Sequence, residues 1–363
     1  MTNRHVLYVF NPEHDLVLAR KTGSFTAPDA ARGLRAGIGF LPALWAGEGD
    51  FVAVCDVHHA VEAFSRFAAG VSAALGVEVC CGAEFVSYDG LRQLPVDDVE
   101  VWGWDRGIRK ELSACGVSEA LLPDDGCLEV IRDLSHRRNA AAFLASSDIP
   151  GTVGEAVGCT DEAMVCDCIG RFHDVVLKAP WSCSGRGLRF AAAGEMSDHL
   201  RGWIRNIIKT QGCVMVEKRY DKVCDFGMEF YSDGKGGVTY CGLSLFSTDN
   251  GAYTGNIVAS EHFKESWLKR YVSESLLNNV RESLVCWCSH IYNNMYRGFF
   301  GVDMMIVRDA GDAAFKVHPC VEINLRRTMG HAALALTPAE DTGRMATMAI
   351  TKKDKYQLNI NIL

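Results

Sequence analysis

The sequence contains no long apolar segment and no basic tract. Its first fifteen residues hold one short apolar run interrupted by polar residues, which predicts neither a signal peptide nor a membrane span. The formal net charge is −8, whereas binding to a phosphate backbone requires clustered Lys and Arg side chains. These absences favour a cytoplasmic protein and argue against membranes and nucleic acids as partners.

The sequence also has no Cys-x-x-Cys pair, although it contains 15 cysteines. The cysteines are scattered, and we expect them to be reduced and to fill small apolar positions in the core. A structural zinc site is the alternative, but neither the spacing nor nearby histidines fit it. What remains is an ordinary globular composition, with 48% hydrophobic and 23% charged residues in a chain of 363. That length predicts two or three domains or lobes.

The first 120 residues alternate strand-like and helical patterns. Strands are predicted at 5–10, 50–55, 77–81 and 99–104, with a helix at 59–75, which favours a parallel, Rossmann-like sheet. No Gly-x-Gly-x-x-Gly follows the first strand, so a dinucleotide is not indicated.

Three polar residues follow the first predicted strand. Asn11, Glu13 and Asp15 are candidates for substrate contact, because ligands bind at the carboxyl ends of the strands in open α/β sheets. The alternative is that Asn11-Pro12 turns the chain and the two acids begin a helix.

A Ser- and Gly-containing loop joins predicted strands at 175–179 and 188–192. Such a loop can direct backbone N–H groups at phosphate oxygens, with Lys178 and Arg186 adding positive charge. The alternative is an exposed hairpin turn with a solvated arginine. The loop is not a P-loop, because it lacks the Gly-Lys-Ser/Thr ending and a strand follows it.

A predicted hairpin at 298–330 carries three oxygen ligands. Strand-like runs at 299–307 and 314–323 flank a polar turn at 308–312. Period-2 alternation places Glu322 and Asn324 on one face, and with Asp303 they have the chemistry of a magnesium site. The alternative for Glu322 is a salt bridge with Arg326 or Arg327.

The spacing of this hairpin sets a geometric condition. Folding it about 309–312 pairs Asp303 with His318, which leaves Glu322 about 13 Å further along the strand. Sharing one metal therefore requires a bulge or bend, and we predict it near His318-Pro319, because proline is found at bulges and edges.

The order of these motifs resembles the ATP-grasp superfamily. Residues 322–326 match its Glu-x-Asn-x-Arg signature, with Leu325 in place of the frequent proline. The resemblance implies an α/β and α+β architecture, in which a Rossmann-like pre-ATP-grasp domain precedes a two-lobed ATP-grasp fold. The implied divisions are 1–125 for the first domain, 126–210 for the small lobe and 211–363 for the large lobe.

The resemblance also implies roles for individual residues. Lys178 and the loop after it would contact the nucleotide phosphates, residues 217–220 would meet the adenine, and Asp225 would bind the ribose unless it is an N-cap or turn acid. Arg137 and Arg138 stand where many members have a lysine. The implied ATP-binding residues are Arg138, Lys178, Ser182, Ser184, Gly185, Arg186, Gly187, Glu217, Lys218, Tyr220 and Asp225. The implied metal ligands are Asp303, Glu322 and Asn324.

The transition-state arginine is less defined. Some members have an arginine two residues before the metal aspartate, where this chain has Gly301, so the role falls to Arg326 or Arg186, with Arg327 as a further candidate. Arg326 could orient the acceptor carboxylate.

The function that the resemblance implies is an ATP- and Mg²⁺-dependent ligase that joins a small carboxylate to an amine through an acylphosphate. The alternatives are another ATP-grasp phosphotransferase or carboxylase-type enzyme, and an inactive ATP-binding regulatory protein. The absence of a biotin-carrier motif argues against a self-contained carboxylase. A homo-oligomer is compatible with the sequence, and neither substrate can be identified from it.

Overall fold

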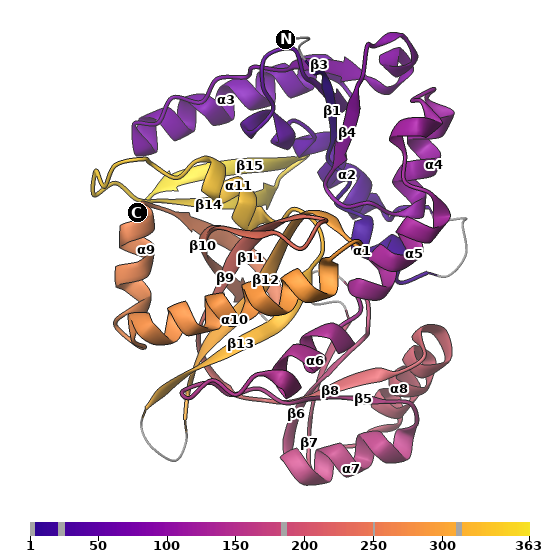
Figure 1. Ribbon diagram of the computed structural model, residues 1–363, viewed down its shortest axis with the longest axis vertical. Coiled ribbons are helices and arrows are strands. Elements are labelled where there is room, and N and C mark those ends of the chain that lie inside the picture. The colour runs from indigo at the N-terminus through magenta and orange to yellow at the C-terminus, as the bar shows by residue number, and fades with distance from the viewer. Residues whose placement is uncertain (1–3, 21–25, 183–186, 250, 310–313) are drawn as a thin grey trace.

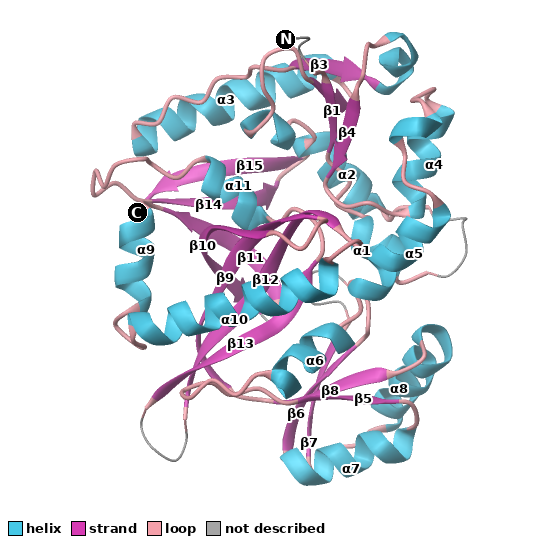
Figure 2. Ribbon diagram, in the orientation of Figure 1, coloured by secondary structure: helices cyan, strands magenta, loops and turns pink. Residues whose placement is uncertain are grey.

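The computed structural model describes residues 4–20, 26–182, 187–249, 251–309 and 314–363 (Figure 1). Its described strands form three sheets, each with its own helices (Figure 2). No helix in these ranges combines the length and apolarity of a membrane-spanning segment.

The first sheet has four parallel strands in the order β3-β2-β1-β4. The strands are β1 (Val6–Val9), β2 (Phe51–Val54), β3 (Glu84–Ser87) and β4 (Asp98–Val101). The helices are α1 (His14–Leu18), α2 (Asp29–Ile38), α3 (Val57–Leu75), α4 (Arg106–Ala114) and α5 (Asp125–Leu134). The predicted parallel sheet is therefore present. The third strand was misplaced, however, because it begins at Glu84 and not at residue 77.

The second sheet is antiparallel, in the order β5-β8-β6-β7. Its strands are β5 (Ala156–Cys159), β6 (Asp174–Lys178), β7 (Leu188–Ala192) and β8 (Val214–Lys218). It is accompanied by α6 (Arg138–Ser146), α7 (Glu162–Phe172) and α8 (Asp198–Gln211). This sheet and its helices lie at the bottom of the molecule in the view of Figure 1.

The third sheet has seven antiparallel strands in the order β13-β12-β9-β10-β11-β14-β15. They are β9 (Asp221–Asp233), β10 (Val238–Asp249), β11 (Ala252–Val258), β12 (Arg297–Arg308), β13 (Phe315–Asn324), β14 (Ala346–Lys352) and β15 (Tyr356–Ile362). The helices are α9 (Glu261–Leu268), α10 (Glu274–Tyr292) and α11 (Met329–Ala335). The α10 helix packs its buried side, including Val280, Leu284 and Cys288, on the core beneath this sheet.

Three features differ from the prediction. The apolar spacing in the sequence predicts one helix over 128–145 and one long helix near 263–295, but each stretch contains two helices, α5 and α6 in the first and α9 and α10 in the second. In the second case Ser273 caps a new helix by accepting a hydrogen bond from the N–H of Leu276 at 3.2 Å. The turn residues at 247–256 predict a loop, but this stretch contains most of β11.

The β14–β15 hairpin also serves the first domain. Met348 and Leu358 of the hairpin share a core cluster with Phe64 and Phe67 of α3, and β15 lies against α2 and α3. The predicted divisions after residues 125 and 210 stay predictions, and the third segment covers part of the first.

Candidate functional site

A cavity of about 260 Å³ opens where β9, β10, β12, β13 and the loop after β1 come together. Its polar lining residues are Asp15, Arg137, Ser182, Glu229, Ser244, Thr248, Asn256, Asp303, Glu322, Asn324, Arg326 and Thr328. Apolar residues of the first domain, such as Phe10 and Trp102, complete the wall. The three residues expected to bind metal therefore share one cavity.

A bulge in β13 brings the metal candidates together. Met305 lies opposite His318, but two residues earlier on β12 Asp303 lies opposite Glu322. One residue of β12, Met304, thus lies opposite three residues of β13, of which Pro319 is the first. The predicted bulge near His318-Pro319 is confirmed. The starting register was wrong by two residues, because His318 pairs with Met305 and not with Asp303.

Asp303, Glu322 and Asn324 form a compact oxygen-rich group. The Asn324 Nδ2 donates a hydrogen bond to the Asp303 carboxylate at 2.9 Å. Burial, followed by repulsion from Glu322, raises the pKa of Asp303 to about 7. Two carboxylates and an amide suit a hard divalent cation, which would also relieve this repulsion. Across the described ranges, no set of three His, Cys, Asp or Glu side chains is arranged to hold a metal. The candidate set here consists of two carboxylates and the amide of Asn324.

Arg137, not Arg138, points into the site. Its guanidinium is buried and donates to Glu322 at 2.7 Å and to the Ser182 hydroxyl at 2.8 Å. Arg138 is half exposed and pairs with Asp133 on the surface. Arg138 does not line this cavity, because α6 begins there and its first turn directs that side chain outward. Its implied role at the nucleotide stays a prediction.

Lys178 lies beside the bulge. Its ammonium pairs with Glu217 at 2.5 Å and donates to the carbonyl of Val321 at 3.3 Å. Both charged side chains are buried. The pairing fixes Lys178 between the second sheet and β13, next to the metal candidates. It also gives the Glu217 side chain a structural partner.

The other residues expected at the nucleotide lie around this cavity and do not line it. Lys218 is placed over the Tyr220 ring at 5.5 Å, and Tyr220 packs on His318 at 5.6 Å between ring centroids. Asp225 accepts hydrogen bonds from Lys222 and Thr248, each at 2.6 Å. Asp225 lies inside β9, so the alternative of an N-cap or turn acid does not apply.

The glycine-containing loop is described only at its ends. Ser182 lines the cavity, while a Cβ on Gly187 would lie 2.4 Å from the Ser182 side chain, so only glycine permits this close approach. Ser184, Gly185 and Arg186 lie outside the described residues.

Arg326 joins the site to the first domain. Its Nη2 donates to Asp15 at 2.8 Å and to the Asn324 Oδ1 at 3.0 Å. Burial alone would raise the pKa of Asp15, but the adjacent Arg326 guanidinium lowers it overall. Of the residues after β1, Asp15 therefore reaches this site. Asn11 instead binds Gly103 and Asp105, and Glu13 pairs with Arg35.

The sequence reasoning missed Glu229. It is fully buried, and its Oε2 accepts a hydrogen bond from Thr328 at 2.9 Å and lies 3.0 Å from His331. Burial, followed by the charge of Asp303, raises its pKa to about 8. A Cβ on Gly330 would lie 1.9 Å from the Glu229 Oε1, so glycine leaves room for this carboxyl group. The sequence does carry a signal for Glu229. Asp225, Gly227 and Glu229 alternate along a strand-like run, so Glu229 is expected on the same face as the ribose candidate Asp225.

No protein-family model matches the sequence, and no curated protein matches it significantly. Solved structures do match the fold. The biotin carboxylase domain of 2-oxoglutarate carboxylase from Hydrogenobacter thermophilus has a TM-score of 0.54 at 13% identity, covering 96% of this chain and 74% of its own.

Two further structures give the same result. N5-carboxyaminoimidazole synthetase from Staphylococcus aureus has a TM-score of 0.51 at 13% identity, covering 96% of this chain and 82% of its own. A protein assigned to the ATP-grasp superfamily from Archaeoglobus fulgidus has a TM-score of 0.52 at 13% identity, covering 99% and 100%. At this identity the likeness establishes the fold, and the predicted fold class is confirmed.

Proposed function

We propose that this chain, which has the fold of the ATP-grasp superfamily, uses ATP and Mg²⁺ to join a small carboxylate to an amine through an acylphosphate. The observation that carries the proposal is the bulge that places Glu322 opposite Asp303 in a cavity shared with Asn324. A carboxylate is a poor electrophile, so phosphorylation by ATP makes it reactive. Mg²⁺, when bound, neutralises charge on the phosphate oxygens.

The side chains around the metal candidates support this chemistry. Arg137 and Lys178 are buried cations within hydrogen-bond reach of β13, so they can stabilise phosphate oxygens in a site with little water. Ser182 is held by Arg137 at the start of the glycine-containing loop. These residues position the transferring group, which is the main task of the protein in phosphoryl transfer.

Arg326 is proposed as a positioning residue. Its Nε and Nη2 bind Asp15, and its Nη1 donates to the Arg327 carbonyl at 3.1 Å. Contact with an acceptor carboxylate would therefore require an exchange of partners. In its present arrangement Arg326 holds the amide of Asn324 beside Asp303.

Glu229 is proposed to receive the amine. A buried carboxyl group beside Asp303, with space cleared by Gly301 and Gly330, can accept a hydrogen bond from an ammonium or amine.

The structural relatives add support from what was bound to them. The S. aureus enzyme was solved with ADP, and the H. thermophilus domain with MgADP and bicarbonate. A cytoplasmic location and small-molecule carboxylate and amine substrates belong to the same proposal.

The test is ADP release from Mg-ATP in the presence of pools of carboxylic acids and amines. We expect release that depends on both substrates and is lost in Asp303→Asn and Glu322→Gln variants, with Asp354→Asn in an exposed turn as the matched control. Absence of substrate-dependent release across a broad panel would overturn the ligase proposal. Mg-ATP binding without any turnover would instead identify an ATP-binding regulatory protein.

A further inference from the structure

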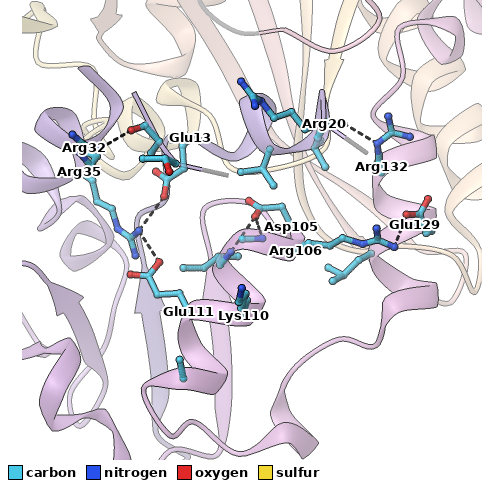
Figure 3. A pocket seen from close by; sticks show the side chains of 18 residues that line it. Glu13, Arg20, Arg32, Arg35, Asp105, Arg106, Lys110, Glu111, Glu129 and Arg132 are labelled. Atoms are coloured by element: carbon cyan, nitrogen blue, oxygen red, sulfur yellow. Dashed lines mark hydrogen bonds and ion pairs between the residues drawn. The ribbon is translucent and has the colours of Figure 1, made fainter. Parts of the chain in front are cut away.

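A second, larger cavity of about 660 Å³ lies in the first domain, between α1, α2, α4 and α5 (Figure 3). It shares no lining residue with the cavity that holds Asp303 and Glu322. The residue Glu13 lines it, whereas Asp15, two positions later, lines the other cavity. The two cavities therefore lie on different sides of α1, and phosphoryl transfer does not account for the larger one.

Its position in the sheet is the first argument for a ligand. In the order β3-β2-β1-β4, the strands that follow β1 in the sequence, β2 and β3, lie on one side of it, and β4 lies on its other side. Glu13 and Asp105, which both line the cavity, closely follow β1 and β4. This is the point where strand order reverses, and ligands of open α/β sheets bind in the crevice at such a point.

Asp105 builds the frame of the crevice. Its Oδ1 accepts hydrogen bonds from the N–H groups of Gly107 at 2.7 Å and Ile108 at 3.0 Å, which caps α4. Its Oδ2 accepts from Asn11 at 3.1 Å and lies 3.2 Å from His14. Both carboxylate oxygens are thus engaged within the protein.

The charges around the cavity do not balance. Among the described lining residues, six are cations, Arg20, Arg32, Arg35, Arg106, Lys110 and Arg132, and four are acids, Glu13, Asp105, Glu111 and Glu129. Arg35 binds both Glu13 at 3.0 Å and Glu111 at 2.9 Å, and Arg106 binds Glu129 at 2.7 Å. All four acids therefore already have partners.

Arg132 and Lys110 are two lining cations with which none of the four acids pairs. Neither forms an ion pair with a carboxylate in the described part of the chain. The guanidinium of Arg132 stacks on the Trp181 ring at 3.8 Å, and its Nε donates to the Leu18 carbonyl at 2.8 Å. These contacts fix the plane of a guanidinium that still has donor capacity, the arrangement that suits carboxylate or phosphate recognition.

Apolar side chains line the cavity together with the charged groups. They are Val17, Leu18, Ile108 and Leu128. In Figure 3 Arg132 lies beside Arg106 and Glu129, while Lys110 lies nearer Glu111. A ligand that contacts both cations needs two anionic groups, and the apolar lining suits a carbon skeleton between them.

We propose that this cavity binds a small organic dianion, a dicarboxylate or a phosphorylated carboxylate, with one anionic group at Arg132 and the other at Lys110. The inference is independent of the proposed ligase activity, because none of its residues belongs to the metal or nucleotide site.

Isothermal titration calorimetry with glutarate and 3-phosphoglycerate tests the proposal. We expect one of them to bind at millimolar concentration or below, and glutaramide, the neutral match of glutarate, not to bind. Lys110→Gln and Arg132→Gln should each weaken binding by about tenfold or more, as expected for loss of a charge-assisted hydrogen bond. Arg66→Gln, an exposed arginine on α3, is the matched control and should bind as the parent does.

Binding of neither probe, binding of glutaramide equal to that of glutarate, or unchanged affinity in Lys110→Gln would overturn the proposal. Lys110 is exposed, so its variant keeps the fold even if Arg132→Gln loses the stacking on Trp181. A parallel titration of Asp303→Asn separates the two cavities, because the proposal requires unchanged probe binding in that variant. Loss of binding there would place the probe in the other cavity and overturn the inference.

Discussion

Asp303 and Glu229 are carboxyl groups that the protein keeps partly protonated near neutral pH. Burial is the first cause for both, and each is further affected by a neighbouring acid, Glu322 for Asp303 and Asp303 for Glu229. Carboxylates in contact with one another cannot all be ionised unless a cation compensates them. The proton state of this cluster should therefore control both metal binding and stability.

Metal-dependent nucleotide binding should increase with pH. The pKa of Asp303 is about 7, so a metal must displace its proton at pH 6 but much less at pH 8. We expect the Mg²⁺-dependent part of the thermal stabilisation by ADP to grow severalfold over this range. Asp303→Asn should flatten the profile, and equal Mg²⁺ effects at pH 6 and pH 8 in the parent protein would contradict the prediction.

Glu229→Gln should change how stability depends on pH. The folded-state pKa of Glu229 is about 8, above the ordinary glutamate value of 4.5, so the folded protein binds more protons between these values and its stability falls as pH rises through them. This group can account for a loss of up to about 2.5 kcal/mol in the free energy of unfolding between pH 5.5 and 7.5. Urea unfolding of parent and Glu229→Gln without metal measures it, and identical slopes would show that Glu229 is already ionised.

Single site residues can be identified from the sequence when their spacing along a strand relates them to one another. Asp303, Glu322 and Asn324 could be selected because strand alternation and a short signature relate them. Arg137 and Glu229 could not be ranked in the same way. Their roles depend on the burial of each side chain by segments that lie 90 or more positions away, such as Thr328 against Glu229.

At the scale of single elements, the β12–β13 hairpin shows what a strand count can predict. In a regular antiparallel pairing Asp303 and Glu322 would lie too far apart to share a metal, which predicts a bulge, and the structure has one beside Pro319. The register itself was two residues off, because the length of the turn, and not the strand pattern, sets it. Helix breaks such as that between α9 and α10 were missed, since the apolar spacing continues across them.

Gly330 at the start of α11 offers a test of the space around Glu229. A Cβ there would lie 1.9 Å from Oε1, so Gly330→Ala should displace the carboxyl group and destabilise the protein by about 1–3 kcal/mol. Gly202→Ala in α8 is the matched control, because nothing lies within 4 Å of its Cβ and alanine favours helices by about 0.5–1 kcal/mol. Chemical denaturation compares them, and equal stability of the two variants would disprove the crowding.

At the scale of the whole molecule, the β14–β15 hairpin ties together segments from opposite ends of the sequence. Leu358→Ala should cost about 2–5 kcal/mol, because this side chain is 6% exposed in a cluster with Phe64 and Phe67. Amide hydrogen exchange should also show reduced protection in α3. Ile362→Ala, with 70% exposure, should change stability by less than about 0.5 kcal/mol, and comparable losses in both variants would contradict the packing.

This packing explains why the sequence pattern after Gly330 predicts no particular structure or role. Two short strands carry no local sign of the surface they cover, and the partners of β15 on α2 and α3 are about 300 positions away. The motifs that resemble the ATP-grasp superfamily lie between α3 and β14 in the sequence. Each of them could be identified from its own short stretch of residues.

The same hairpin has a consequence for synthesis on the ribosome. Residues 4–122 emerge first, yet the outer faces of α2 and α3 are covered by residues 346–362, which emerge more than 200 residues later. Synthesis proceeds at about 5–20 residues per second, so roughly ten seconds or more pass before residues 346–362 can pack on Phe64, Phe67 and their neighbours. During that interval the nascent chain should present an apolar surface, which makes the first domain a natural client for chaperones that bind growing chains.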